Sequence, residues 1–544
     1  MTKVAQDGVA PEVETVSPKN KMGLLGGISY IVGNIVGAGI FITPTAILTN
    51  TNSVGLSLFI WIFTGVIAAL GSFSYIELGT AIHESGCDFA YACYVKWYAL
   101  AFCYMCVGCL VHYPAVVAIQ AQTFSEYLFV GLNLAGCDTA PNGLFSTYAA
   151  RKLLEVALIS ILVYLNFFSL RKFVSRFNIL ATTAKIMATA SIIIIGLYFL
   201  IAKGRVQNFN EPFKNSTFSS SNLVSALFAG LFSYDGWDIL NFGTEEIVSP
   251  RRTLPLSIII GMSIVCSIYV LINVAYFTVL DVPSFLSTNA VASTFVKVTI
   301  GEYSFLMPIM VCILIVGSLN GTIFVSSRFL HAAARGGFLP TFISCTNPET
   351  DSPRAALVIH LVLVFTMTFT ADLHALINYI GFAQWSQRGI TMVVLFWIRY
   401  KHASRQNANV IRAPLIVPIL FFLICSGLTV VTVVEDTKSA LLCVIVLLVT
   451  YVIYIIFIYD KALPSQKWYR GYAEKADSAF TSIFQVMLDT MPQKLQMINE
   501  PEIDQQNASP KPIENSKATD SINGKRSDKR RRVGAAQKVG PITS

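Results

Sequence analysis

The sequence is poor in charge. Only 13% of its 544 residues are charged, 54% are hydrophobic, and the mean hydropathy is +0.61. Soluble domains carry about 25% charged residues, so this composition excludes an ordinary soluble protein and indicates a membrane protein. The first 20 residues also lack a basic stretch followed by a short apolar core and a small-residue cleavage site. We therefore expect no cleaved signal peptide.

The sequence also lacks the local motifs of enzymes and metal sites. Its six histidines form no H-E-x-x-H pattern, and there is no nucleophile elbow, Walker motif or dinucleotide fingerprint. Cys103, Cys106 and Cys109 are regularly spaced, but their neighbours are apolar (CYMCVGCLV). That context favours buried thiols in a spanning helix over a zinc knuckle. We expect no enzymatic activity, no cofactor and no metal.

Long apolar runs, in contrast, are abundant. A helix needs about 20 apolar residues to cross a bilayer, and twelve segments meet this need. The fold class that we predict is an all-α membrane protein with twelve transmembrane helices. The segments are 24–48, 54–82, 91–130, 152–169, 176–202, 221–247, 254–280, 303–332, 354–371, 373–399, 412–434 and 438–460.

The segments divide the chain into three parts: a polar N-terminal segment (1–22), a transmembrane domain (23–460) and a tail (461–544). An excess of Lys and Arg in alternate short loops places both termini in the cytoplasm and the sequon at Asn215 outside. In the tail, 476–491 has the pattern of an amphipathic surface or docking helix.

The end of the tail is polar and is expected to be disordered and basic. Its run KRSDKRRR (525–532) resembles a nuclear address. In a chain that crosses the membrane twelve times, we interpret this run as a solvated or lipid-headgroup-binding cluster. The expected contact is the lipid bilayer, and no nucleic-acid partner is expected.

Two of the predicted spans carry residues that interrupt helices. The first contains Gly33, Gly37 and Gly39 in mid-membrane, and the sixth contains Gly236. Glycines in one span alone would favour close helix packing. Breaks at corresponding places in two halves of a chain are instead typical of a transporter site.

Breaks of this kind have a direct chemical consequence. An unwound segment frees N–H groups at the start of one half-helix and C=O groups at the end of the other. The former attract an anion and the latter a cation, so a solute with a carboxylate and an ammonium on one carbon satisfies both. We expect the N–H groups of Gly37, Ala38 and Gly39 to bind an α-carboxylate. Carbonyl groups near Ile35 and Phe232 are then expected to accept from an α-ammonium.

At these residues the chain resembles the light subunits of heteromeric amino-acid transporters, in the amino acid–polyamine–organocation superfamily. The resemblance covers roughly residues 22–460. It rests on GNIVGAGIF (33–41), YIELGT (75–80), GLFSYDGWDILNFGTEE (230–246), SPRRTLP (249–255), GSLNGTIFVSSR (317–328) and INYIGFAQW (377–385).

The resemblance implies a 5+5 inverted repeat with discontinuous helices 1 and 6 plus two further helices. It also implies sodium-independent exchange of amino acids by alternating access. The middle residue of the triplet at 37–39 is commonly Ser in the family, so Ala38 removes one hydroxyl donor. By the resemblance, Phe232 in span six matches the aromatic that closes the site from outside, and Phe382 and Trp385 in span ten match aromatics that wall the side-chain pocket. The resemblance also implies that Ser233 binds substrate and that Asn320 in span eight has a coupling or structural role.

Lys185 lies inside the fifth predicted span, in ILATTAKIMATASIII. It could be a lysine that snorkels from near a helix end. The resemblance implies instead that its ammonium tethers span five to the broken first span. The ammonium then stands where sodium sits in related sodium-coupled carriers.

Cys137 lies between spans three and four, outside the membrane in the expected topology. An unpaired outside cysteine suggests a disulfide to another chain. The resemblance implies that this chain is a single-span glycoprotein heavy chain, and an idle thiol is the alternative.

Asp235 raises the question of what a carboxylate faces inside an apolar span. By the resemblance, leucine-preferring light chains have Gly here, whereas the one that carries cystine and dibasic amino acids has Asp. We therefore predict that Asp235 contacts a cationic substrate side chain. It could instead cap the second half-helix, or pair with Arg388, a charge that departs from the family pattern.

These observations give one functional hypothesis and its alternatives. We expect a sodium-independent transporter of the plasma membrane, an exchanger, that carries large neutral and cationic amino acids. The alternatives are a neutral-only, leucine-preferring exchanger and, from a different functional class, a non-transporting amino-acid sensor. An ion channel would show polar stripes along several spans, whereas only two short breaks are present.

Overall fold

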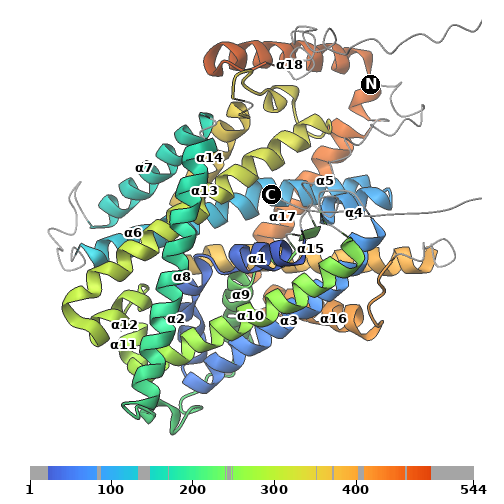
Figure 1. The fold of residues 1–544 in the computed structure, drawn as a ribbon. Helices are drawn as coiled ribbons and strands as arrows, with labels where there is room; N and C mark the ends of the chain where they lie inside the picture. The colour runs from blue at the N-terminus through green and yellow to red at the C-terminus, as the bar shows by residue number, and fades with distance from the viewer. Residues whose placement is uncertain are drawn as a thin grey trace, which may run out of the picture. The chain divides into compact units, whose positions relative to one another are not determined.

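The computed structural model is a bundle of helices (Figure 1). It describes residues 23–82, 87–132, 147–168, 171–238, 240–241, 247, 249–350, 352–370, 373–401, 410–459 and 462–491. No β-strand lies within these residues, and an isolated bridge joins Thr346 to Met491. The predicted all-helical class is confirmed. The predicted N-terminal segment, Cys137 and the basic end of the tail lie outside the described residues.

The helices in the first half of the chain cover five of the predicted spans and part of the sixth. They are α1 (Leu24–Ile35), α2 (Gly39–Thr51), α3 (Val54–Ala81), α4 (Asp88–Tyr94), α5 (Tyr98–Val107), the π-helical turn η2 (Gly108–His112), α6 (Tyr113–Gly131), α7 (Thr147–Phe167), α8 (Arg171–Ile201), η4 (Gln207–Phe209) and α9 (Ser220–Ser233).

The second half continues in the same manner. Its helices are α10 (Pro250–Val279), α11 (Val282–Leu286), α12 (Val291–Ile300), η6 (Gly301–Phe305), α13 (Leu306–Arg335), η7 (Thr341–Ser344), α14 (Arg354–Thr370), α15 (Leu373–Lys401), α16 (Ile416–Glu435), α17 (Thr437–Ile453), η8 (Tyr454–Ile458), η9 (Leu463–Ser465) and α18 (Lys467–Leu488).

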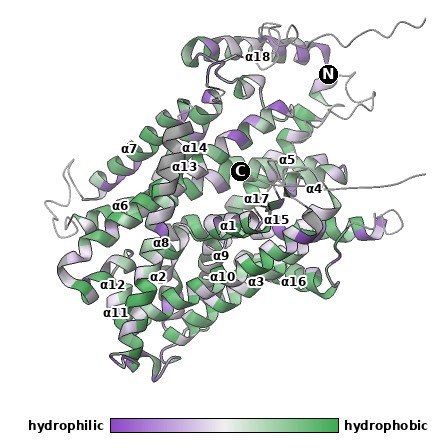
Figure 2. Cartoon of the chain, in the orientation of Figure 1, coloured by the Kyte–Doolittle hydropathy of each residue, from purple (hydrophilic) through white to green (hydrophobic). Residues whose placement is uncertain are grey.

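Seven of the described helices are long and apolar enough to cross a membrane, and the bent pair α1 and α2 raises this to eight. Helices α9, α12 and α14 are apolar but shorter. Apolar residues run along the bundle helices in Figure 2, whereas hydrophilic residues gather on α18 and at the connection between α8 and α9. Large apolar side chains such as Ile194, Leu423 and Leu448 are exposed on the outside, as lipid contact requires. The chain is therefore a multi-span membrane protein, while the count of twelve stays a prediction.

Both predicted helix interruptions are present. The first span bends by 50° between α1 and α2, and α9 ends at Ser233 before a turn over 234–238. Helix α1 packs on α10 and α2 packs on α9, so the two interruptions meet near the centre of the bundle (Figure 1). The fold thus brings two segments about 200 positions apart in the chain to one place.

Helix α18 begins at Lys467 and ends at Leu488, so it starts earlier than the predicted 476–491. One side docks on η7, where Phe484 stacks on Phe342 with ring centroids 4.7 Å apart. Val486, on the opposite side of the helix, is exposed. The helix therefore has a docked side and an open side.

Candidate functional site

A cavity of about 830 Å³ lies between the two interrupted helices. Seven of the nine predicted substrate-binding residues line it: Ile35, Gly37, Ala38, Gly39, Phe232, Ser233 and Asp235. Phe382 and Trp385 do not, because both are buried behind the wall, 3% and 2% exposed. Trp385 packs edge-on against Phe421, with ring centroids 5.8 Å apart.

The first interruption leaves backbone donors beside this cavity. Helix α1 ends at Ile35, and α2 starts at Gly39 with no side-chain cap. Within the described residues, the N–H groups of Gly37 and Ala38 donate to no backbone carbonyl, and the N–H of Gly39 opens a helix. A Cβ on Gly39 would lie 2.8 Å from the Cα of Ser233, so glycine is required where α2 crosses α9.

The second interruption is held to the first by side chains from several elements. The hydroxyl of Tyr269 on α10 lies 2.8 Å from the carbonyl oxygen of Ile35 and 2.9 Å from that of Ser233, so the two acceptors share its single proton. Asn34 donates to the carbonyl of Gly236 (3.3 Å), whose φ of +98° favours glycine. The Ile35 carbonyl predicted to accept from the substrate thus already has one partner, although a carbonyl oxygen has two lone pairs.

The cavity extends along α1 and is closed on the side of α2. It reaches Ser29 and Tyr30 on α1. Beyond the break, the hydroxyls of Thr43 and Ser233 lie 2.6 Å apart, and Tyr127 donates to the carbonyl of Phe41 (3.0 Å). These buried contacts separate the cavity from the far end of α2.

Lys185 on α8 also lines the cavity. Its ammonium donates a 2.7 Å hydrogen bond to the carbonyl of Gly33, in the last turn of α1. The side chain therefore has the geometry of a tether to the broken helix, one of the two alternatives that the sequence left open.

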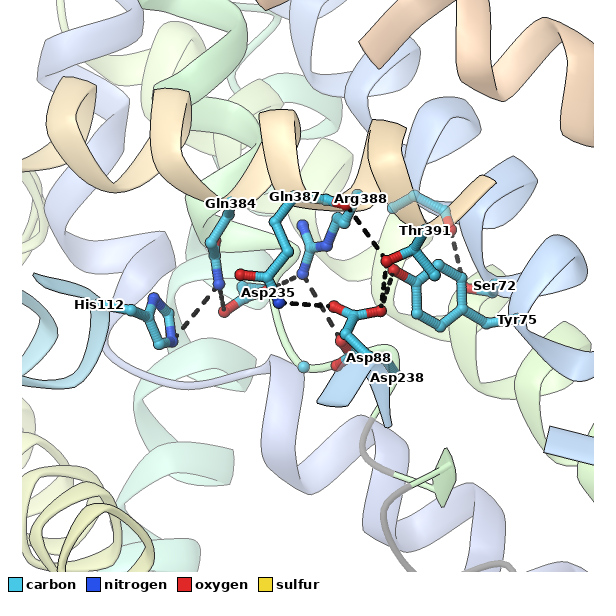
Figure 3. A network of polar contacts seen from close by, with 12 residues as sticks. Ser72, Tyr75, Asp88, His112, Asp235, Asp238, Gln384, Gln387, Arg388 and Thr391 are labelled. Carbon is cyan, nitrogen blue, oxygen red and sulfur yellow. Dashed lines mark hydrogen bonds and ion pairs between the residues drawn. The ribbon is translucent and has the colours of Figure 1, made fainter. Parts of the chain in front are cut away.

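Asp235 pairs with Arg388 of α15 (Figure 3). Its Oδ1 accepts a 2.6 Å hydrogen bond from Nη2 of Arg388, and Nη2 also lies 3.7 Å from Oδ2 of Asp238. The second oxygen of Asp235 is 3.5 Å from Nε2 of Gln384. Of the three alternatives for Asp235, the structure shows the pair with Arg388.

The comparisons with known proteins agree with this architecture. A sequence profile of the amino acid permease family matches residues 22–459. The chain belongs to this family. It is 50% identical over 488 residues to "Amino acid transporter protein 6" of Caenorhabditis elegans, covering 90% of this chain and 92% of the relative.

Two mammalian relatives are also similar along most of their length. The human "Cystine/glutamate transporter" is 35% identical over 485 residues, covering 89% of this chain and 93% of the relative. The mouse "b(0,+)-type amino acid transporter 1" is 33% identical over 482 residues, covering 88% and 95%. The resemblance to amino-acid transporters inferred from the motifs is confirmed.

This permease has further polar residues at the cavity that the sequence analysis missed. Asp88, at the start of α4, accepts hydrogen bonds from Tyr75 (2.6 Å), Gln387 (2.9 Å) and Thr391 (3.0 Å) (Figure 3). His112 enters from the π-helical turn η2, 3.4 Å from Gln384. A π-turn is often found at functional sites but leaves no clear mark in the sequence. Asp88 stands directly before the apolar residues of α4, and this position was its one sign in the sequence.

The remaining predicted residues have structural surroundings. Asn320 accepts a 2.8 Å hydrogen bond from Asn166 and joins α13 to α7, away from the cavity lining. Cys103, Cys106 and Cys109 are buried thiols in α5 and η2, as the apolar context indicated.

Proposed function

We propose that this permease is a sodium-independent amino-acid exchanger that works by alternating access between two sides of the plasma membrane. The observation that carries the proposal is the meeting of two interrupted helices at one cavity, with free backbone N–H groups at the start of α2. A family of amino-acid transporters supplies the chemical class of the solute.

The backbone recognises the part that all amino acids share. The α-carboxylate binds the N–H groups of residues 37–39, where the dipole of α2 favours an anion. The α-ammonium binds carbonyl oxygens at the ends of α1 and α9, near Ile35 and Phe232. The cavity of about 830 Å³ leaves room for large side chains.

Lys185 supports sodium independence. Its ammonium lies 2.7 Å from the carbonyl of Gly33, one of the oxygens that a cation near the broken helix would use. A resident positive charge there both satisfies the carbonyl and repels a second cation. The transporter therefore needs no sodium ion to hold the first interruption in shape.

Alternating access is supported by the asymmetry of the cavity. It reaches the α1 side and is closed on the α2 side by the contacts of Thr43 and Tyr127. With a cytoplasmic N-terminus, this is an inward-facing state. We place it in a fold of twelve spans with a 5+5 inverted repeat and two further helices.

The partner in this proposal is a single-span glycoprotein heavy chain bonded through Cys137. The substrates in this proposal are large neutral amino acids, with or without cationic ones. Because Arg388 already pairs with Asp235, the alternative of a neutral-only exchanger gains support.

The test is flux. The chain is co-purified with a heavy chain and reconstituted into liposomes loaded with unlabelled leucine, and the uptake of labelled leucine is measured in sodium and in choline buffer. We expect equal uptake in the two buffers and a severalfold higher rate with internal leucine than without. Leucine binding without any flux would indicate a sensor and not a transporter. A need for sodium would refute the role of Lys185.

A further inference from the structure

Arg388 is unusual because it is a cation buried in the wall of a site for small solutes. Its side chain is only 4% exposed. Its guanidinium lies over the rings of Trp237 (4.8 Å) and Trp385 (4.7 Å), so two indole faces hold the charge in place. The side chain is therefore a fixed component of the wall.

The carboxylates around the guanidinium are unequal in their access to the cavity. Arg388 approaches two of them, and the side chain of Asp235 is 26% exposed whereas that of Asp238 is 16% exposed. Asp88 is occupied by three other donors, one hydroxyl each from Tyr75 and Thr391 and the amide of Gln387. The carboxylate that a substrate side chain reaches most easily is thus the one that Arg388 binds most closely (Figure 3).

We infer that Arg388 sets the charge of the side chain that the transporter accepts. This inference rests on the proposed function. The guanidinium occupies the position that a cationic substrate side chain needs at Asp235, and it is tethered there by the protein. A lysine or arginine substrate meets a like charge a few ångströms away, whereas an uncharged side chain leaves the pair intact.

Removal of the guanidinium reverses this preference. Asp235 and Asp238 then face the cavity without their counter-ion, which is unfavourable for buried charges. An ammonium group on the substrate side chain replaces the missing positive charge. The variant Arg388→Met therefore gains affinity for cationic amino acids relative to neutral ones.

The experiment compares lysine with norleucine, which is lysine without its terminal ammonium, as inhibitors of labelled leucine exchange in the reconstituted complex. In the wild type we expect norleucine to inhibit about tenfold or more better than lysine, since one like-charge contact is enough for that ratio. In Arg388→Met the ratio falls by at least about tenfold, because an unpaired carboxylate now binds the ammonium.

Two further variants control the charge change. Asp235→Asn combined with Arg388→Met removes both charges of the pair and returns the preference toward norleucine. Arg205→Met removes an exposed arginine in the connection after α8 and leaves the ratio unchanged. Arg388→Gln keeps a hydrogen-bond donor for Asp235 and serves where Arg388→Met does not fold.

The outcomes separate this inference from the proposed function. Absence of any leucine exchange by the wild type overturns both. Exchange of leucine together with equal inhibition by lysine and norleucine overturns only the role of Arg388. An unchanged ratio in both Arg388 variants does the same.

Discussion

The ammonium of Lys185 donates a 2.7 Å hydrogen bond to the carbonyl of Gly33, and so joins α8 to the last turn before the first helix interruption. Lys185→Met removes a charge-assisted hydrogen bond of about 1.5–3 kcal/mol. We expect leucine exchange in liposomes to fall about tenfold or more. Lys203→Met, which changes an exposed lysine after α8, should keep the wild-type rate. A wild-type rate in Lys185→Met would show that the tether is dispensable.

The hydroxyl of Tyr269 holds the two interruptions together, and Tyr276 offers a matched control on the same helix. Both side chains are fully buried, but the Tyr276 hydroxyl has no hydrogen-bond partner among the described residues. Tyr269→Phe removes the donor that the carbonyls of Ile35 and Ser233 share, which lowers the free energy of unfolding by about 1–3 kcal/mol. We expect a melting temperature several degrees lower in detergent for Tyr269→Phe and no decrease for Tyr276→Phe. Equal melting temperatures would contradict the bridging role.

Gly39 is required by the close approach of α2 to α9. Gly39→Ala places a methyl group 2.8 Å from the Cα of Ser233, so the helices must separate and the break changes shape. Exchange should be lost, while Gly427→Ala on α16, where a Cβ meets nothing within 4 Å, should keep it. Normal transport by Gly39→Ala would mean that the break tolerates a wider gap.

Helix α18 is docked through Phe484 on one face and is open on another. Phe484→Ala deletes the stacked contact with Phe342, whereas Val486→Ala truncates an exposed side chain. We expect faster hydrogen exchange across 467–491 in Phe484→Ala only. Identical exchange in the two variants would assign the docking to the polar contacts, such as the 2.9 Å hydrogen bond from the Thr341 N–H to Asp477.

The disulfide to a heavy chain is tested on a non-reducing gel. Cys137→Ser should remove the high-mass band of the co-expressed complex, and Cys266→Ser, in the middle of α10, should keep it. A high-mass band that persists in Cys137→Ser would exclude this cysteine as the link.

The sequence predicted those parts of the site that depend on backbone. Glycines at 37, 39 and 236 mark places where a helix cannot continue or where another chain segment comes close, and both interruptions lie where these residues indicated. Long apolar runs likewise predicted the helices that form the bundle.

The side-chain pairing could not be predicted in the same way. Tyr269, His112 and Asp88 contact partners far away in the chain, and no local spacing records such contacts. For Asp235 the sequence left three possible partners open: a substrate cation, the second half-helix and Arg388. Only the packing of α15 in the structure shows that Arg388 is the partner. Phe382 and Trp385 were expected in the pocket but are packed behind it, since a helical pattern fixes which residues share a face and not how deep they lie.

The central claim is that the backbone at the two interruptions binds both charged groups of an amino acid. The most direct measurement compares leucine, leucinamide and N-acetylleucine as inhibitors of labelled leucine exchange by the wild-type complex. Leucinamide lacks the carboxylate and N-acetylleucine lacks the ammonium, so each loses charge-assisted hydrogen bonds. We predict that both inhibit about tenfold or more weakly than leucine. Inhibition by either compound as strong as that by leucine would contradict the account.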